Sequence, residues 1–273
     1  SIAANTVEEM WQRAPETESV ADVIEFRLDS LRELTPEEAR VIVTERLRHT
    51  ALPVILTCRP WEVCSELGSW SLENRVRLWR SLFSVNHQND LYFDLELDLV
   101  NWFRARHESI PWKQIIASYH NFIETPATLS ELYESLANTR AGILKVAPQA
   151  EDISDNLKIF ELLRQAQQTN RKFIGIARGA AGLITRILGP LYGSFLTFGA
   201  LTSEEQTAPG QIVASELRGL YRLHELGPRP KVMGVIGNPI SHSLSPLIHG
   251  LWPRNSGVKS GRSAILPLSG GMS

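Results

Sequence analysis

Short apolar runs alternate with longer segments of helical pattern along most of this chain. The runs have the length and composition of strands, and they occupy residues 23–29, 53–59, 91–97, 113–122, 142–147, 172–178 and 194–201. Helix-start signals stand between them, as at Thr35, where Pro36 and Glu38 complete a capping-box pattern. Strands that alternate with helices predict βαβ units and a parallel sheet.

The number of strands separates two kinds of α/β fold. Seven runs are complete, and residues 1–4 supply the stub of an eighth. Eight units in about 225 residues is the size of a (β/α)8 TIM barrel. The alternative is a doubly wound sheet, but no G-x-G-x-x-G turn opens a helix after the first strand. We therefore expect an α/β fold, a (β/α)8 TIM barrel with a short C-terminal appendage.

The chain changes character near Pro228 and Pro230. A new strand-like run, KVMGVIG, begins at Lys231, and from Pro253 the sequence loses its periodicity and becomes rich in Ser and Gly. These changes predict three parts: a barrel over residues 1–227, a separate fragment over 228–250, and a disordered or aberrant tail over 251–273.

The composition excludes several classes of protein. The 28 Lys and Arg against 30 Asp and Glu give a formal net charge of −2, so we expect no nucleic-acid or membrane partner. No apolar run reaches the roughly 18 residues of a membrane span. Two cysteines, Cys58 and Cys64, are too few for a disulfide framework or a Cys-rich zinc site. The opening residues lack a signal-peptide pattern, and we expect a soluble, cytoplasmic protein.

Catalytic groups of a TIM barrel project from the C-terminal ends of its strands. The corresponding positions and the segments that follow them carry Glu25, Arg27, Asp29, Arg59, Asp94, Glu96, Asp98, Ser118, His120, Lys145, Arg186 and the sequence TAPGQ at 207–211. An amine, an imidazole and several guanidiniums at one barrel mouth favour chemistry on a carbonyl compound that carries a carboxylate.

Lys145 is the most informative of these residues. It lies inside a short apolar run, where burial favours the neutral amine that Schiff-base formation requires. The alternative is a lysine on the outer face of the barrel, paired with a helix carboxylate. His120 suits a proton shuttle because an imidazole titrates near neutral pH, and the alternative is a hydrogen-bonded core histidine.

Four other residues are candidates for substrate contacts. Arg59 and Arg186 suit bidentate binding of a substrate carboxylate, with surface arginines as the alternative. Glu25 and Arg27 are interpreted either as an acid–base helper and a substrate clamp or as an interior ion pair.

The acidic residues Asp94, Glu96 and Asp98 alternate as if they shared one face of a strand. Carboxylates can bind a metal ion, but no histidine or further carboxylate stands near them in the sequence. We therefore expect no metal site.

Eight short motifs in a fixed order carry a family resemblance. They are EFRLD (25–29), TCR (57–59), FDLEL (93–97), SYHNF (118–122), ILKVA (143–147), GLITRI (182–187), GSFLTFGA (193–200) and TAPGQ (207–211). Together they resemble type I 3-dehydroquinate dehydratases over nearly all of residues 1–227.

The resemblance implies a metal-free and nucleotide-free dehydration of 3-dehydroquinate to 3-dehydroshikimate, a step of the shikimate pathway. It implies that Lys145 forms an imine with the C3 ketone and that His120 removes the C2 proton and protonates the departing C1 hydroxyl in a syn elimination. Glu25 would orient His120. The residues implied to bind the substrate are Arg27, Arg59, Arg186, Thr207, Gln211 and Glu66.

The chain departs from the family pattern at three places. The acidic turn after Arg59 is longer than usual, so either Glu62 or Glu66 takes its carboxylate role. Arg178 stands where a methionine is common, and Thr207 replaces the usual serine of the S-A-P-G-Q motif. We expect these changes to affect substrate affinity more than chemistry.

Residues 234–250, GVIGNPISHSLSPLIHG, resemble the first strand and substrate loop of shikimate dehydrogenases. Ser243 and Ser245 match the paired serines that bind shikimate there, and fusions of the two enzymes are known. The catalytic Lys and Asp and the dinucleotide-binding domain should follow but do not, so we expect no dehydrogenase activity and no NADP binding.

The main interpretation is therefore a lyase that needs no cofactor beyond its own lysine. Its partner is the small-molecule substrate 3-dehydroquinate, and the sequence is compatible with a homodimer. The alternatives are another Schiff-base barrel, such as a class I aldolase, and a catalytically silent barrel with an open edge.

Overall fold

The structure is a computed structural model in which the described residues are 1–31, 34–60, 70–85, 87–226, 231–237, 244–245, 248 and 263–269. The chain divides into two compact units. Unit 1 holds Ser1–Tyr119 and Glu134–Leu144, and unit 2 holds His120–Tyr133 and Lys145–Ser273.

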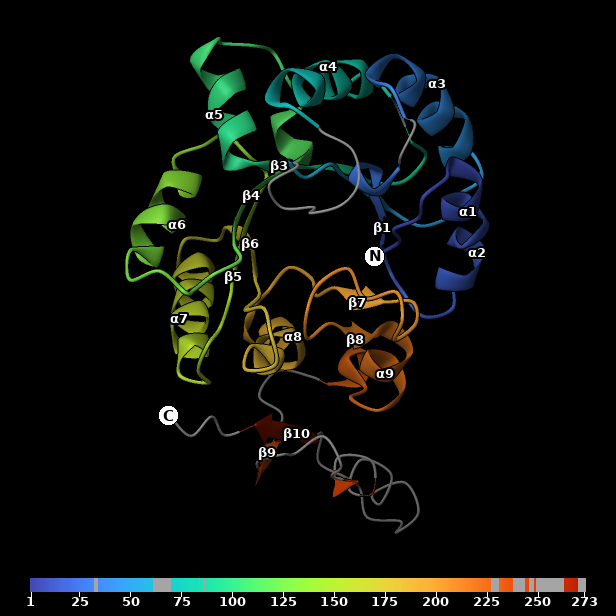
Figure 1. Cartoon of the computed structure of the whole chain (residues 1–273). Coiled ribbons are helices and arrows are strands. Elements are labelled where there is room, and N and C mark those ends of the chain that lie inside the picture. Colours follow the sequence, from blue (N-terminus) through green and yellow to red (C-terminus); the bar gives the residue numbers. More distant parts are fainter. Residues whose placement is uncertain are drawn as a thin grey trace. The chain divides into compact units, whose positions relative to one another are not determined.

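Parallel strands form the framework, in agreement with the α/β fold predicted from the sequence (Figure 1). Six strands form one sheet in chain order: β1 (Ile24–Arg27), β2 (Val54–Thr57), β3 (Leu91–Glu96), β4 (Ile115–Asn121), β5 (Ile143–Pro148) and β6 (Lys172–Gly175). In unit 1, β2 pairs with β3 so that Thr57 stands opposite Asp94, and β3 pairs with β4 so that Glu96 stands opposite Ser118. This register aligns the polar ends of neighbouring strands.

Two predicted strands are shorter than expected. At the start of the chain only Ile2 forms a bridge, to Phe26 of β1. Within 194–201 only β7 (Gly199–Ala200) is a strand, and it pairs with β8 (Ile212–Val213), which the sequence pattern did not predict. The chain leaves a left-handed turn at Gly193, and the Ser194 hydroxyl then donates to the Leu196 carbonyl 3.0 Å away. The Phe195 N–H donates to the Phe173 carbonyl of β6 at 2.7 Å, so this stretch keeps one backbone bond to β6.

Nine helices accompany these strands in the described residues, and the helix at Pro36 begins where the sequence predicts it. Their bounds are α1 (Val7–Gln12), α2 (Ala14–Thr17), α3 (Pro36–Leu47), α4 (Leu72–Leu82), α5 (Leu97–Ala105), α6 (Leu129–Ala137), α7 (Asp155–Gln168), α8 (Leu183–Leu188) and α9 (Ala214–Gly219). The capping box of α3 is confirmed, because the Thr35 hydroxyl accepts from the Glu38 N–H and the Glu38 carboxylate accepts from the Thr35 N–H. None of the helices in the described residues is long and apolar enough to cross a membrane.

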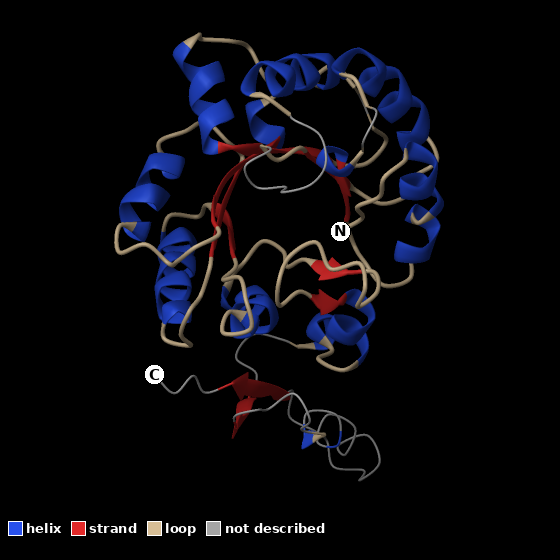
Figure 2. Ribbon diagram, viewed as in Figure 1, coloured by secondary structure: helices blue, strands red, loops and turns tan. Residues whose placement is uncertain are grey.

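Aromatic side chains fill the core of unit 1 between the sheet and its helices. Helices α3, α4 and α5 lie along one face of β1–β3 (Figure 2). Trp79 of α4 meets Phe93 of β3 edge-on with ring centroids 5.9 Å apart, and Phe83 contacts Phe93 and Phe103 at 5.3 and 5.5 Å. These rings pack the helices against one face of the sheet, and their burial stabilises that packing.

A smaller cluster in unit 2 joins α8, β8 and α9. Its buried members are Ile187, Leu188, Ile212, Leu217 and Tyr221. The cluster anchors α8, which carries Arg186, and the end of the segment 207–211. Two groups of the predicted site therefore stand on packed elements.

One stretch of the tail carries a strand. Residues Ser263–Ser269 form β10, which pairs in parallel with β9 (Lys231–Gly237). The run SAILPLS is apolar enough to extend beside the unpaired edge of β9. The rest of the tail and the boundary predicted at 227–228 lie wholly or partly outside the described residues, and the three-part division stays a prediction.

Candidate active site

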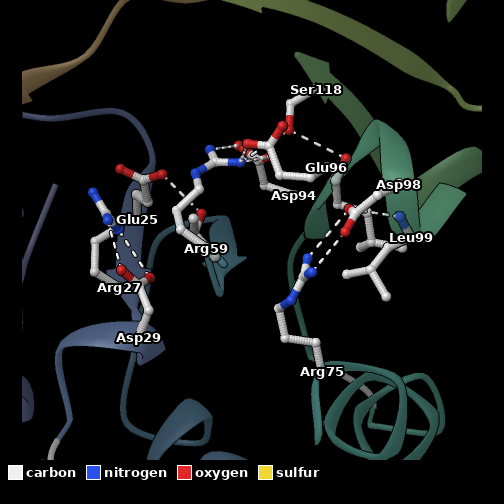
Figure 3. A network of polar contacts seen from close by, with 12 residues as sticks. Glu25, Arg27, Asp29, Arg59, Arg75, Asp94, Glu96, Asp98, Leu99 and Ser118 are labelled. Atoms are coloured by element: carbon white, nitrogen blue, oxygen red, sulfur yellow. Dashed lines mark hydrogen bonds and ion pairs between the residues drawn. The ribbon is translucent and has the colours of Figure 1, made fainter. Parts of the chain in front are cut away.

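Arg59 in unit 1 donates through its two terminal nitrogens to acceptors on β3 and β4 (Figure 3). Its Nη2 donates to Asp94 Oδ2 at 2.6 Å, and its Nη1 lies 2.9 Å from Asp94 Oδ1, 2.7 Å from Glu96 Oε1 and 2.9 Å from Ser118 Oγ. Its side chain is 4% exposed, so the surface-arginine alternative is wrong. The alignment of the ends of β2, β3 and β4 brings these groups together.

The protonation state of Arg59 follows from its burial and from the two carboxylates that it contacts. Burial by itself lowers the pKa of the guanidinium, but the negative charges of Asp94 and Glu96 outweigh burial and raise the pKa above its ordinary value. Arg59 is therefore a permanent cation that two carboxylates neutralise.

Strand β1 carries two further charged residues of the predicted site, Glu25 and Arg27. Arg27 makes a fork with Asp29, from Nε to Oδ1 at 3.0 Å and from Nη2 to Oδ2 at 2.6 Å. Glu25 is 6% exposed and accepts from the Thr57 hydroxyl at 2.8 Å. Both Glu25 and Arg27 come from β1, and each has a partner that holds its side chain in place.

The acidic row of β3 does not share one strand face. The strand ends at Glu96, and Asp98 lies in the first turn of α5, where its carboxylate accepts from the Leu99 N–H. Arg75 of α4 also donates to this carboxylate, through two bonds of 2.6 and 3.2 Å. That part of the prediction is wrong because the helix starts before the alternation is complete. Across the described ranges, no group of three His, Cys, Asp or Glu side chains has an arrangement that could hold a metal ion.

Lys145 in unit 2 is a buried amine. Every residue of β5 is buried, Lys145 itself is 4% exposed, and its Nζ lies 4.2 Å from the centre of the Phe198 ring. The ring limits the access of water to the amine and leaves Nζ close to the segment just before β7. A shielded amine of this kind has the surroundings that imine chemistry requires.

His120 lies near the end of β4 and stacks with planar side chains. Its ring is parallel to the Phe122 ring within 14°, with centroids 6.0 Å apart, and the Arg178 guanidinium lies 3.9 Å from the centre of the Phe122 ring. His120 is half-buried, so it is not a core histidine. The stack holds the imidazole in a defined orientation while part of it stays accessible.

Arg186 is a buried guanidinium with no carboxylate partner among the described residues. It is 3% exposed on α8, and its Nε has no hydrogen-bond partner among the described residues. Burial, and to a lesser extent the positive charge of Arg178, together lower the pKa of Arg186 to about 10. A buried cation that lacks an ion pair within the described part of the chain is suited to bind an anion.

The segment 207–211 folds back on itself beside the turn at Gly179. The Thr207 N–H and hydroxyl donate to Gln211 Oε1 at 2.8 and 3.1 Å, and the Gly179 N–H donates to the Pro209 carbonyl at 3.2 Å. Gly210 has a φ of +72°, and a Cβ there would lie 2.4 Å from the Gly179 carbonyl oxygen. Only glycine permits this approach.

We expect Gly210→Ala to loosen the segment and to lower the free energy of unfolding by about 1–3 kcal/mol. The matched control is Gly219→Ala in α9, where an added Cβ meets nothing within 4 Å and the chain should be unchanged or slightly more stable. Thermal unfolding of both variants measures the difference. Equal stability of the two variants would contradict the close approach at Gly210.

The remaining predicted residues lie mostly outside the described part. Glu62, Glu66 and Ser243 fall in undescribed segments, and Ser245 is described as half-buried. Sequence reasoning missed the contacts of Arg59 with Asp94, Glu96 and Ser118, which depend on how the distant strands pair. It also missed the ring of Phe198 beside Lys145, for which the sequence holds no local signal.

Comparison with known proteins identifies the family. The sequence profile of type I 3-dehydroquinase matches residues 1–228. The chain is 36% identical over 236 residues to the bifunctional, chloroplastic 3-dehydroquinate dehydratase/shikimate dehydrogenase of Arabidopsis thaliana, covering 84% of this chain and 37% of that protein. It is 32% identical over 234 residues to the 3-dehydroquinate dehydratase of Methanocaldococcus jannaschii, covering 82% of this chain and 97% of that protein.

A solved structure agrees in fold. The 3-dehydroquinate dehydratase of Geobacillus kaustophilus superposes with a TM-score of 0.69 at 23% identity, covering 80% of this chain and 86% of that one. The chain thus spans just over a third of the bifunctional plant protein and nearly the whole of the archaeal enzyme. On the extent of the profile match and the archaeal similarity, this chain belongs to the type I 3-dehydroquinase family.

Proposed function

We propose that this chain converts 3-dehydroquinate to 3-dehydroshikimate by eliminating water through an imine on Lys145. The observation that carries the proposal is the shielded amine: Lys145 is 4% exposed in a strand whose residues are all buried. Membership of the type I family and relatives that bear the name 3-dehydroquinate dehydratase support the choice of substrate.

The chemistry runs in four steps. The Lys145 amine adds to the C3 ketone and water leaves, which forms an iminium ion. His120 takes the C2 proton, and the electron pair of that C–H bond moves into the iminium to give an enamine. The enamine then expels the C1 hydroxyl, which leaves as water with a proton from His120, and a second water hydrolyses the iminium to release product and amine. One water is lost overall.

The other predicted residues receive supporting roles in the proposal. Arg186 binds the substrate carboxylate because it is a buried cation whose described neighbours supply no ion pair. Thr207 and Gln211 also bind the substrate. Three further residues bind its hydroxyl side: Arg27, Arg59 and Glu66. Glu25 orients His120. The family resemblance implies the role of Glu25 and implies that the other residues bind the carboxylate and hydroxyls of the substrate. The division of Arg186 and Arg59 between its two sides is part of the proposal.

No separate cofactor takes part in the proposed reaction, since the iminium supplies the electron sink. We also propose that the segment resembling shikimate dehydrogenase, with Ser243 and Ser245, has no dehydrogenase activity in this chain and binds no NADP. The cytoplasmic location and the homodimer remain proposals, and the plant relative is chloroplastic.

The proposal is tested by incubating the purified chain with 3-dehydroquinate. Formation of a conjugated carbonyl raises the ultraviolet absorbance, and mass spectrometry of the product should register the loss of one water. Adding NADPH should change nothing further. A cooperatively folded chain that forms no product would favour the silent barrel, and cleavage of a carbon–carbon bond in place of dehydration would favour an aldolase.

A further inference from the structure

The guanidinium of Arg59 is held by more acceptors than its charge requires (Figure 3). Asp94 engages both terminal nitrogens, at 2.6 and 2.9 Å, and this fork alone neutralises the cation. Glu96 adds a second carboxylate at 2.7 Å, and Ser118 adds a hydroxyl oxygen at 2.9 Å. All four side chains belong to unit 1.

The arrangement is rigid because each acceptor is itself fixed. Asp94 and Ser118 are 0% exposed, and Glu96 is 9% exposed. The Ser118 hydroxyl donates to the Leu95 carbonyl at 3.1 Å, so a lone pair of its oxygen is directed to Arg59. A buried charge network whose acceptors are held in this way keeps one geometry.

We propose that Asp94 is a positioning residue, which fixes the plane of the Arg59 guanidinium so that its remaining N–H groups face the substrate. The inference rests on the proposed function, in which Arg59 binds the hydroxyl side of 3-dehydroquinate. Asp94 acts through Arg59 and does not touch the substrate. Ser118 supports the same orientation from β4.

Asp94→Asn removes the fork while keeping the shape of the side chain. An asparagine presents one acceptor oxygen where aspartate presents two, so one terminal nitrogen of Arg59 loses its partner. The guanidinium then gains freedom to rotate toward Glu96. We expect affinity for 3-dehydroquinate to fall about tenfold, as small misplacements of a substrate-binding group do.

The chain offers a matched control in a second arginine–aspartate fork. Arg75 pairs with Asp98 through the same two-bond geometry, at 2.6 and 3.2 Å, between α4 and α5. Asp98→Asn should leave substrate affinity unchanged, because neither member of this pair is assigned to the site. The control separates loss of a fork in general from loss of the fork on Arg59.

A double-mutant cycle on affinity tests the inference. Calorimetry measures 3-dehydroquinate binding with Asp94→Asn, with Arg59→Gln and with both, each in the Lys145→Ala background so that no imine forms. The inference predicts that Asp94→Asn weakens binding about tenfold when Arg59 is present and has no further effect once Arg59 is replaced. Equal effects of Asp94→Asn in both backgrounds, or no effect in either, would overturn it.

Two additions keep the result unambiguous. Ser118→Ala is the milder variant if Asp94→Asn does not fold, and it should weaken binding about threefold by the same route.

Turnover by the unmodified chain is measured beside the cycle. An active chain without coupling refutes only the positioning role, whereas an inactive chain that binds substrate refutes the proposed dehydration. A parent that binds no substrate refutes both.

Discussion

Replacing Lys145 with alanine is expected to lower kcat for 3-dehydroquinate by about four orders of magnitude or more. The covalent intermediate depends on its amine, and none of the other proposed groups supplies an electron sink. The fold should survive, because the change removes a buried polar group from β5. Steady-state turnover and thermal unfolding of the same preparation measure both effects.

Lys172 provides the matched control for this prediction. It is a lysine at the start of β6 whose Nζ lies 4.9 Å from the centre of the Phe195 ring, but its side chain is exposed. Lys172→Ala should retain the kcat of the parent within about twofold. Comparable activity of the Lys145→Ala variant would remove the imine from the mechanism.

Replacing Arg186 with methionine is expected to weaken substrate binding and to stabilise the protein. Loss of a charge-assisted contact to the substrate carboxylate should raise KM on the order of a hundredfold. The same change removes a buried cation whose pKa burial and Arg178 lower to about 10, so the free energy of unfolding should rise by about 1–3 kcal/mol. Function and stability should therefore move in opposite directions.

The pH dependence of this stabilisation follows from the sign of the shift. A guanidinium with a lowered pKa in the folded state is charged in both states below about pH 10, so the cost of burying it is fully present at neutral pH. That cost declines only as the pH rises from about 10 toward the higher, ordinary pKa of a guanidinium. The gain in stability of the Arg186→Met variant should thus be constant across the neutral range.

Arg164→Met controls for removal of an arginine in general. Arg164 lies on α7 with a side chain that is 66% exposed and a 3.4 Å contact to Glu161. Such a surface pair contributes little to stability, so this variant should keep both the KM and the melting temperature of the parent. An Arg186→Met variant that is less stable than the parent would show that the guanidinium has a structural partner.

The positions of the reactive groups were predictable because each stands on a locally recognisable element. Lys145 and His120 end or interrupt apolar runs that have strand length, and Thr35 carries a complete capping signal. These signals depend on residues within a few positions of one another. The parallel framework followed from their alternation with helices.

The partners of Arg59 were not predictable, because they depend on pairing between distant segments. Asp94 reaches Arg59 through the register that places Thr57 opposite Asp94, 37 positions along the chain, which no local pattern encodes. Asp98 was misplaced since the alternation of charges continues past Glu96, while the backbone turns into α5. The short strands β7 and β8 have two residues each, too few for a periodic signal.

The central claim is that Lys145 forms an imine with the substrate, and trapping that imine tests it most directly. Borohydride reduces an iminium to a stable secondary amine, so the parent and the Lys172→Ala variant incubated with 3-dehydroquinate should gain one covalent adduct in an intact-mass spectrum. The Lys145→Ala variant should gain none. A folded parent without an adduct, or an adduct that persists after Lys145 is replaced, would contradict the account.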